Sequence, residues 1–326
     1  MERDVGLVYL PPVNGLPGVE ERHLLRLRRE VPDFDWIPCA DRDEFFARLP
    51  EARVALVWAF GGDWLERAPK LQLIATPAAG RDWIHVQPGP ALELLFGTFH
   101  GVLMAETVAG MMLAFTRGIK DSFDRRDETW PRVEVAGGMR LLRGSHAVIL
   151  GFGHIGKWIG RILVSLGVRV TGVNRTDTAR PDYFTPEDGV VTLSQLDSIM
   201  PEADHFVVAL PSGAGTDNIV DAGRLGLLRR EAYVYNVGRG NAIDMPALID
   251  ALEGGRLAGA GLDVFPEEPL PADAPIRRCR RAILLPHVSA FAPVYMDLYF
   301  DEIVPRLKGM ARDSRADEGS GMSRPE

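Results

Sequence analysis

Three ionisable side chains in the C-terminal half of the chain, Arg239, Glu268 and His287, could take part in catalysis. Each follows an apolar, β-rich run by a few residues. Because the carboxyl ends of parallel strands meet at one edge of a sheet, where open α/β sheets bind ligands, we expect all three at the same edge. Singly, each has a plain alternative: a surface arginine, a solvated glutamate beside Glu267, and a structural histidine. Their order and shared position favour a catalytic site.

A glycine-rich turn is expected to bind the diphosphate of a dinucleotide. The segment Gly151-Phe-Gly153-His-Ile-Gly156 follows a short apolar run and opens a stretch with apolar residues on one helical face. Gly151 permits a tight turn, Gly153 lets a diphosphate approach the backbone, and Gly156 lets helix and strand pack closely. The helix N-terminus, which begins with His154 and Ile155, would then face the phosphates. A glycine turn that binds nothing is the alternative.

The residues after the next predicted strand are expected to set the choice of dinucleotide. A unit that binds NAD typically has Asp or Glu there, which accepts a hydrogen bond from the ribose 2′-hydroxyl. This chain has Asn174, Arg175 and Thr176 instead. Asn174 lacks the charge that would repel a 2′-phosphate, Arg175 can bind phosphate oxygens and Thr176 can donate to them. The pattern predicts NADP(H) in preference to NAD(H), with a solvated turn as the alternative.

Two series of alternating strands and helices must position these residues. Such alternation predicts parallel sheets with helices on both faces, so the fold class is α/β with two doubly wound domains. The expected strands are 5–10, 34–38, 54–60, 71–76, 147–150, 168–173, 205–210, 233–237, 261–265 and 283–285. The expected helices outside the glycine turn are 20–30, 45–49, 64–68, 100–119 and 294–307.

Two segments fall outside this alternation. Residues 120–138 are polar, include Trp130 and Pro131, and are expected to form a connection or an oligomer arm. Residues 311–326 are rich in Gly, Ser, Arg and Asp and are expected to be disordered.

Composition argues against several other classes of protein. The length of 326 residues favours two domains, and the net charge of −8 makes nucleic acid an unexpected partner. Cys39 and Cys279 are the only cysteines, so neither a disulfide framework nor a metal site is expected, and a reducing cytoplasm fits. The apolar runs at 5–10 and 101–115 are too short for a signal peptide or a membrane span, so no membrane association is expected.

Further motifs occur in order along the chain: Thr76-Pro-Ala-Ala-Gly80-Arg-Asp82, Ala105-Glu-Thr-Val-Ala109, Leu210-Pro-Ser-Gly-Ala-Gly-Thr216, Asn236-Val-Gly-Arg-Gly240, Ala260-Gly-Leu-Asp-Val-Phe-Pro-Glu-Glu-Pro269 and Pro286-His287. Together with the glycine turn, they make about residues 50–305 resemble the D-isomer-specific 2-hydroxyacid dehydrogenases. Several motifs in one order are far more specific than any one of them.

The resemblance implies a role for each catalytic candidate. Arg239 would bind the substrate carboxylate, and His287 would give or take the proton at the substrate oxygen. Glu268 would hold the second ring nitrogen of His287 and favour the imidazolium. The backbone amides at Ala79 and Gly80 would bind the carboxylate from the other domain.

The resemblance also implies contacts with the dinucleotide. Asp263 would meet the nicotinamide carboxamide, while Val237 and Arg239 would flank its ribose. The loops expected to hold the cofactor further include Leu210, Pro211, Thr216 and Gly238.

At the level of the whole chain, a Rossmann dinucleotide-binding domain at 100–290 would be inserted in a flavodoxin-like substrate domain at 1–99 and 291–326. The implied reaction is the NADPH-dependent reduction of a small 2-keto acid to the D-2-hydroxy acid, in a homodimer joined through the helix at 100–119 and the arm at 120–138. Two alternatives stay open. One is NAD-linked oxidation of a D-2-hydroxy acid, as in phosphoglycerate dehydrogenases, which the missing ribose carboxylate disfavours. The other is a non-catalytic, dinucleotide-sensing interaction protein, which could keep the same three residues.

Overall fold

The computed structural model describes residues 3–213 and 215–320, the last ten of these as backbone only. The chain divides into two compact units, one made of residues 1–99 and 291–326 and the other of residues 100–290. None of the described helices is long and apolar enough to cross a bilayer.

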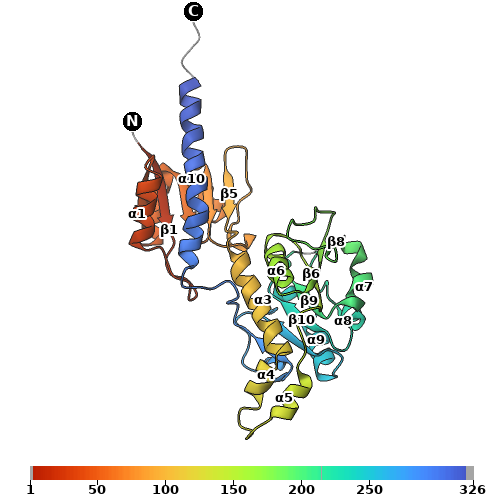
Figure 1. Cartoon of the computed structure of the whole chain (residues 1–326). Helices are drawn as coiled ribbons and strands as arrows, with labels where there is room; N and C mark the ends of the chain where they lie inside the picture. The colour runs from red at the N-terminus through yellow and green to blue at the C-terminus, as the bar shows by residue number, and fades with distance from the viewer. Residues whose placement is uncertain (1–2, 214, 321–326) are drawn as a thin grey trace, which may run out of the picture. The chain divides into compact units, whose positions relative to one another are not determined.

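The first unit is built around a five-stranded parallel sheet with the order β2-β1-β3-β4-β5, which is the flavodoxin-like order. Its strands are β1 (Asp4–Tyr9), β2 (Phe34–Pro38), β3 (Ala52–Val57), β4 (Leu73–Thr76) and β5 (Glu93–Phe96). Its helices are α1 (Glu21–Glu30), α2 (Arg42–Arg48) and α10 (Tyr295–Ser320), with the 3₁₀ turns η1 (Leu49–Glu51), η2 (Gly62–Arg67) and η3 (Arg81–Trp83). Helices α1 and α10 pack side by side over one face of the sheet (Figure 1), and α2 packs on the other.

The second unit contains a seven-stranded parallel sheet with the order β12-β11-β10-β9-β6-β7-β8. Its strands are β6 (His146–Leu150), β7 (Arg169–Asn174), β8 (Gly189–Thr192), β9 (His205–Val208), β10 (Tyr233–Asn236), β11 (Gly259–Leu262) and β12 (Ala282–Leu284). The strand order reverses between β6 and β9, which is the switch point where doubly wound sheets bind ligands. Together the two sheets confirm the expected α/β fold class.

Helices cover both faces of this second sheet. They are α3 (His100–Thr116), α4 (Ile119–Asp124), α5 (Arg132–Gly138), α6 (His154–Ser165), α7 (Leu196–Ile199), α8 (Ala222–Leu227) and α9 (Met245–Glu253), with the 3₁₀ turns η4 (Leu193–Gln195), η5 (Met200–Glu202), η6 (Gly240–Ala242) and η7 (Pro275–Arg278). One apolar core lies between the sheet and α3 and α6, and a second lies under α7, α8 and α9. Helices α3 and α6 touch where Gly101 meets Trp158, because a Cβ on Gly101 would lie 2.2 Å from the indole.

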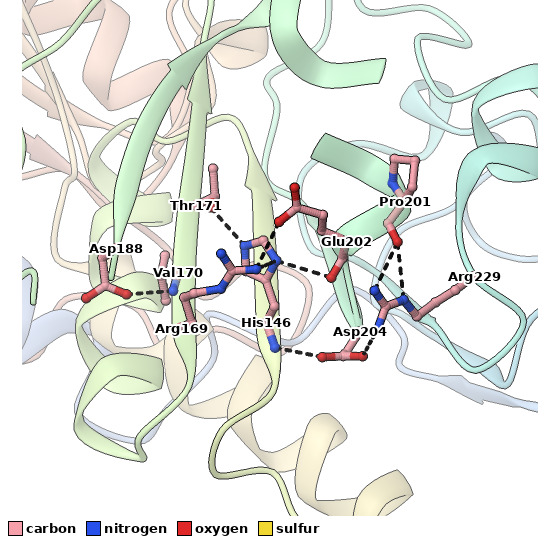
Figure 2. A network of polar contacts seen from close by, with 9 residues as sticks. All are labelled: His146, Arg169, Val170, Thr171, Asp188, Pro201, Glu202, Asp204 and Arg229. Atoms are coloured by element: carbon pink, nitrogen blue, oxygen red, sulfur yellow. Dashed lines mark hydrogen bonds and ion pairs between the residues drawn. The ribbon is translucent and has the colours of Figure 1, made fainter. Parts of the chain in front are cut away.

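A polar network joins the amino-terminal ends of the strands in this sheet (Figure 2). His146 Nε2 lies 2.8 Å from Thr171 Oγ1, and its Nδ1 lies 2.7 Å from a guanidinium nitrogen of Arg169. Asp204 accepts from the backbone N–H of His146 at 2.8 Å and from Arg229 at 3.0 Å. Burial and the charge of Arg169 lower the pKa of His146, so the imidazole is neutral and can accept from Arg169.

Some elements differ from those expected. Strand β3 ends at Val57 rather than residue 60, and residues 64–68 contribute to the 3₁₀ turn η2 instead of an α-helix. Strands β5 and β8 were not expected; each has only four residues and lies at a sheet edge, so its apolar alternation is too short to detect. Residues 311–320, expected to be disordered, continue α10 as a helix, while residues 321–326 lie outside the described residues.

Candidate active site

The three catalytic candidates follow three neighbouring strands. Arg239 comes after β10, Glu268 after β11 and His287 after β12, and these strands pair in parallel. The parallel direction places all three residues beyond the carboxyl edge of the second sheet, as the sequence predicts.

Glu268 and His287 form a direct pair. The distance between His287 Nδ1 and Glu268 Oε2 is 2.6 Å, and the other carboxylate oxygen accepts from the backbone N–H of Phe265 at 2.8 Å. An ionised carboxylate only accepts, so His287 donates from Nδ1. The Nε2 atom has no partner among the described residues, and 51% of the His287 side chain is exposed. The imidazole is therefore oriented on one side and accessible to a ligand on the other.

Asp263 holds the backbone at His287. Its side chain is wholly buried, and its two oxygens accept from the backbone N–H groups of Val288 at 2.8 Å and Ser289 at 3.0 Å. Its carbonyl accepts from the backbone N–H of His287 at 2.9 Å. His287 has a φ of 56°, in the left-handed region that a non-glycine residue occupies only when its surroundings impose it. The carboxylate expected to meet the nicotinamide thus has a structural task in this unit.

Asn236 organises the turn that carries Arg239, and the sequence analysis did not single it out. Its buried amide accepts from the N–H of Gly238 at 3.1 Å and donates to the carbonyl of Arg239 at 2.9 Å. Arg239 Nη1 donates to the carbonyl of Gly238 at 2.9 Å. Gly238 is needed because a Cβ there would lie 2.4 Å from the carbonyl oxygen of Leu210. An asparagine at a strand end, two residues before a glycine, is the signal that could have indicated this role.

The glycine turn has the geometry that a dinucleotide diphosphate needs. Gly151 has a φ of 95°, and a Cβ on Gly156 would lie 2.4 Å from the carbonyl oxygen of Gly151. A Cβ on Gly153 would meet no protein atom within 4 Å. Gly153 is also the N-cap of α6, and no side chain caps the first-turn N–H groups of that helix. Unoccupied space beside uncapped amides fits an anionic phosphate group.

The residues expected at the adenosine ribose differ in how they are engaged. Asn174 donates from its side-chain nitrogen to the carbonyl of Phe152 at 3.2 Å and to Thr178 at 2.7 Å, so both of its N–H groups are used inside the unit. Arg175 and Thr176 are exposed, and Arg175 has no ion-pair partner within the described part of the chain.

The other expected contact residues also fall into two groups. Leu210 is half-buried and Pro211 exposed after β9, and the hydroxyl of Thr216 closes this loop by donating to the carbonyl of Pro211 at 3.1 Å. His154 is exposed and Ile155 half-buried at the start of α6. Val237, by contrast, is buried in the core beneath α3, so only its backbone is available to a ligand.

The two residues expected to bind the substrate carboxylate lie in the first unit, after β4. Ala79 is exposed, and Gly80 is the N-cap of η3. No described residue accepts a hydrogen bond from either backbone amide. Upstream, the buried hydroxyl of Thr76 fixes the loop by donating to the carbonyl of Trp58 and accepting from the N–H of Ala78.

A parallel sheet with a glycine turn at its switch point, and an arginine and a glutamate–histidine pair beyond its carboxyl edge, defines a dinucleotide-binding protein of the dehydrogenase type. Over the described residues, no group of three or more His, Cys, Asp or Glu side chains could hold a metal ion.

Comparison with known proteins agrees with this class. The family model "D-isomer specific 2-hydroxyacid dehydrogenase, NAD binding domain" matches residues 109–289. A glyoxylate reductase of Aeropyrum pernix is 32% identical over 237 residues, which are 70% of either chain. A D-3-phosphoglycerate dehydrogenase of Mycobacterium bovis is 29% identical over 267 residues; these are 78% of this chain but 48% of that enzyme, so the chain spans about half its length.

Among solved structures, a D-isomer specific 2-hydroxyacid dehydrogenase from Xanthobacter autotrophicus, crystallised with NADPH, superimposes with a TM-score of 0.75 at 26% identity and covers 93% of this chain and 95% of that one. The chain belongs to the D-isomer specific 2-hydroxyacid dehydrogenases, a family of oxidoreductases. The family resemblance expected from the motifs is thereby confirmed.

Proposed function

We propose that the protein reduces a small 2-keto acid to the D-2-hydroxy acid with NADPH. The observation that carries the proposal is the 2.6 Å contact between Glu268 and His287, next to the turn that carries Arg239. An imidazole held by a carboxylate, with its other nitrogen accessible, is the arrangement that a proton donor to a substrate oxygen requires. The family membership and the glyoxylate reductase relative support the same reaction class.

Each side chain has a defined task in this reaction. When bound, the reduced nicotinamide supplies a hydride to the carbonyl carbon. Arg239 binds the substrate carboxylate, for which its planar pair of donors is better suited than a lysine. His287 donates the proton from Nε2 to the carbonyl oxygen, and Glu268 stabilises the imidazolium before that transfer. In the reverse direction His287 accepts the proton.

Each unit has binding groups of its own. We assign residues 100–290 to the dinucleotide, on the glycine turn and the uncapped start of α6. We assign residues 1–99 and 291–326 to the substrate, on the unpaired amides of Ala79 and Gly80, which can donate to a carboxylate.

The preference for NADP(H) rests on Arg175 and Thr176. Both are exposed after β7, and no carboxylate stands where an NAD-binding unit would have one. The Xanthobacter relative was solved with NADPH, which supports the assignment. Arg175→Ser should lower kcat/KM for NADPH about 10–100-fold, the usual worth of hydrogen bonds to a charged group, and leave kcat/KM for NADH unchanged. An equal loss with both cofactors would contradict the assignment.

A homodimer is the proposed assembly. The segment from α4 to residue 141 exposes large apolar side chains: Phe123 by 67%, Trp130 by 80%, Val133 by 79% and Leu141 by 74%. A concentration of exposed apolar side chains on one segment is typical of an interface. A second copy of this chain covers Phe123, Trp130 and Val133 in our proposal.

The central experiment is an assay of NADPH oxidation with glyoxylate, hydroxypyruvate, phenylpyruvate and phosphonopyruvate. Reduction of at least one keto acid, with the D-product identified by chiral chromatography, is the expected result. Tight binding of NADPH without turnover of any keto acid would favour a dinucleotide-sensing protein. Oxidation of 3-phosphoglycerate with NAD, faster than any reduction with NADPH, would favour the phosphoglycerate dehydrogenase alternative.

A further inference from the structure

A cavity lies at the opposite end of the seven-stranded sheet from the candidate active site. Its volume is about 220 Å³, and it is lined by the last residue of α3, by residues 140, 141 and 143–145, and by residues at the amino-terminal ends of β9 and β10. Because Arg239 and His287 follow the carboxyl ends of parallel strands in the same sheet, this cavity is separate from them. A water molecule occupies about 30 Å³ in the liquid, so the cavity has room for a small organic molecule.

His205 and Tyr233 line the cavity with polar atoms that have no hydrogen-bond partner among the described residues. His205 is 2% exposed and stacks on Tyr233, with ring centroids 5.6 Å apart. Its Nδ1 lies 3.1 Å from the hydroxyl of Tyr235, but its Nε2 has no partner among the described residues. The hydroxyl of Tyr233 has none there either. Neither atom is among the wholly buried unpaired polar atoms of the described residues, so both are accessible to water or a ligand.

The tautomer of His205 follows from its contact with Tyr235. Burial lowers the pKa of His205 to about 4, so the ring is neutral at neutral pH. Tyr235 is wholly buried, and Nδ1 of His205 is the described acceptor for its O–H. If Nδ1 accepts that hydrogen bond, the proton of the neutral ring is on Nε2. His205 and Tyr233 then both offer donors to the cavity.

The charges around the cavity favour an anion. Arg140 and Arg143 line it and have no ion-pair partner among the described residues. The opposing carboxylates are Glu231 and Asp204, and Asp204 is already engaged by the N–H of His146 and by Arg229 (Figure 2). Arg140 acts on Tyr233 directly, because its charge opposes the rise that burial causes in the pKa of that phenol.

We propose that this cavity binds a small carboxylate, whose oxygens accept hydrogen bonds from Arg140, from the hydroxyl of Tyr233 and from Nε2 of His205. A guanidinium and two neutral donors match the acceptor-only chemistry of a carboxylate. The site does not depend on the proposed reaction, although substrates and products of that reaction belong to the same chemical class.

The test uses the full chain with Arg239→Gln, which removes the candidate carboxylate site at the other edge of the sheet. The protein is labelled with ¹³C at histidine Cε1 and observed by NMR while pyruvate is added. Pyruvate replaces chloride in the buffer, so that the ionic strength stays constant. We expect a saturable shift of the His205 signal, which is assigned by its loss in His205→Asn. Should that variant fail to fold, Tyr233→Phe assigns the signal through the ring contact.

Variants then separate the site from a general effect of charge. Adding Arg140→Gln should raise the dissociation constant for pyruvate at least tenfold. The control is Arg132→Gln, which should leave that constant unchanged because Arg132 is exposed on α5 and lies outside the cavity. Tyr233→Phe should raise the dissociation constant for pyruvate about tenfold without lowering the free energy of unfolding, because the lost hydroxyl has no partner among the residues that the structure describes. No saturable shift, an equal shift with chloride, or undiminished binding in Arg140→Gln would overturn the proposal.

Discussion

At the scale of single residues, the candidate active site depends on how His287 is held rather than on its presence alone. The ring is fixed at Nδ1 by Glu268, and the backbone is fixed in the left-handed region by three hydrogen bonds to Asp263. An imidazole so constrained loses little orientational freedom when a substrate arrives, which is how positioning contributes to rate. We therefore expect His287 to be sensitive to changes in its two acidic partners.

Replacement of His287 by Ala should lower kcat for keto-acid reduction by about 10²–10⁴, the usual contribution of a general acid. The dissociation constant for NADPH, measured by fluorescence titration, should change little and serves as the control. An unchanged kcat in the variant would remove His287 from the mechanism.

At the scale of elements, the turn between β6 and α6 combines a folding requirement and a binding requirement at different glycines. Gly156 has no room for a Cβ because the carbonyl of Gly151 is too close, whereas Gly153 has a φ of −79° and open space around it. A side chain should therefore be tolerated by the fold at Gly153 and resisted at Gly156.

This difference gives a matched pair of substitutions. Gly153→Ala should lower the free energy of unfolding by no more than about 1 kcal/mol, the usual cost of Ala at an N-cap, and raise the dissociation constant for NADPH at least tenfold. Gly156→Ala should lower the free energy of unfolding by about 1–3 kcal/mol, as overpacking does. Urea unfolding and calorimetric titration measure the two effects. If Gly153→Ala bound NADPH normally, this turn would not be the diphosphate site.

The amino-terminal ends of β6 and β9 should make the second unit sensitive to acid. Burial is the main cause that lowers the pKa of both His146 and His205, to about 4 for His205, against an ordinary value of about 6.5 in an unfolded chain. Below pH 6.5 the unfolded state therefore binds more protons than the folded state, and the free energy of unfolding falls as pH decreases toward 4.

The loss attributable to His205 should approach about 3 kcal/mol at the acid end of this range. Urea unfolding of the parent protein and of His205→Gln at several values between pH 7 and pH 4.5 measures it. The variant should show a shallower dependence on pH because one of the two buried imidazoles is gone. Parallel curves for the two proteins would show that His205 does not carry the effect.

At the scale of the whole molecule, the proposed dimer explains the apolar side chains that the second unit exposes between α4 and residue 141. Each large apolar side chain buried at an interface contributes on the order of 1.5–3 kcal/mol. Phe123→Ser together with Trp130→Ser should weaken the dimer more than 100-fold and give a monomer in light scattering, with an unchanged circular dichroism spectrum. Leu25→Ser, at an exposed apolar position on α1 in the first unit, is the control and should leave the mass unchanged. A parent protein that is already monomeric would refute the proposal.

The sequence alone determined the α/β class, most strands, the glycine turn and the strand ends at which Arg239, Glu268 and His287 lie. These features follow from local periodicity and from the rule that parallel strands end at one edge, so they need no knowledge of distant contacts. The short edge strands β5 and β8 were not predicted, because four residues are too few to show the apolar alternation of a strand.

Only the tertiary structure decided which polar groups are already engaged. Both carboxylate oxygens of Asp263 accept hydrogen bonds from backbone N–H groups 25 and 26 positions later in the chain. The side-chain N–H groups of Asn174 donate to Phe152 and Thr178. Val237 is part of the apolar core. The cavity that His205 and Tyr233 line likewise forms where separate segments between residues 116 and 233 come together. Hydrogen bonding and burial depend on pairs of residues far apart in the chain, and a pattern along the sequence does not specify those pairs.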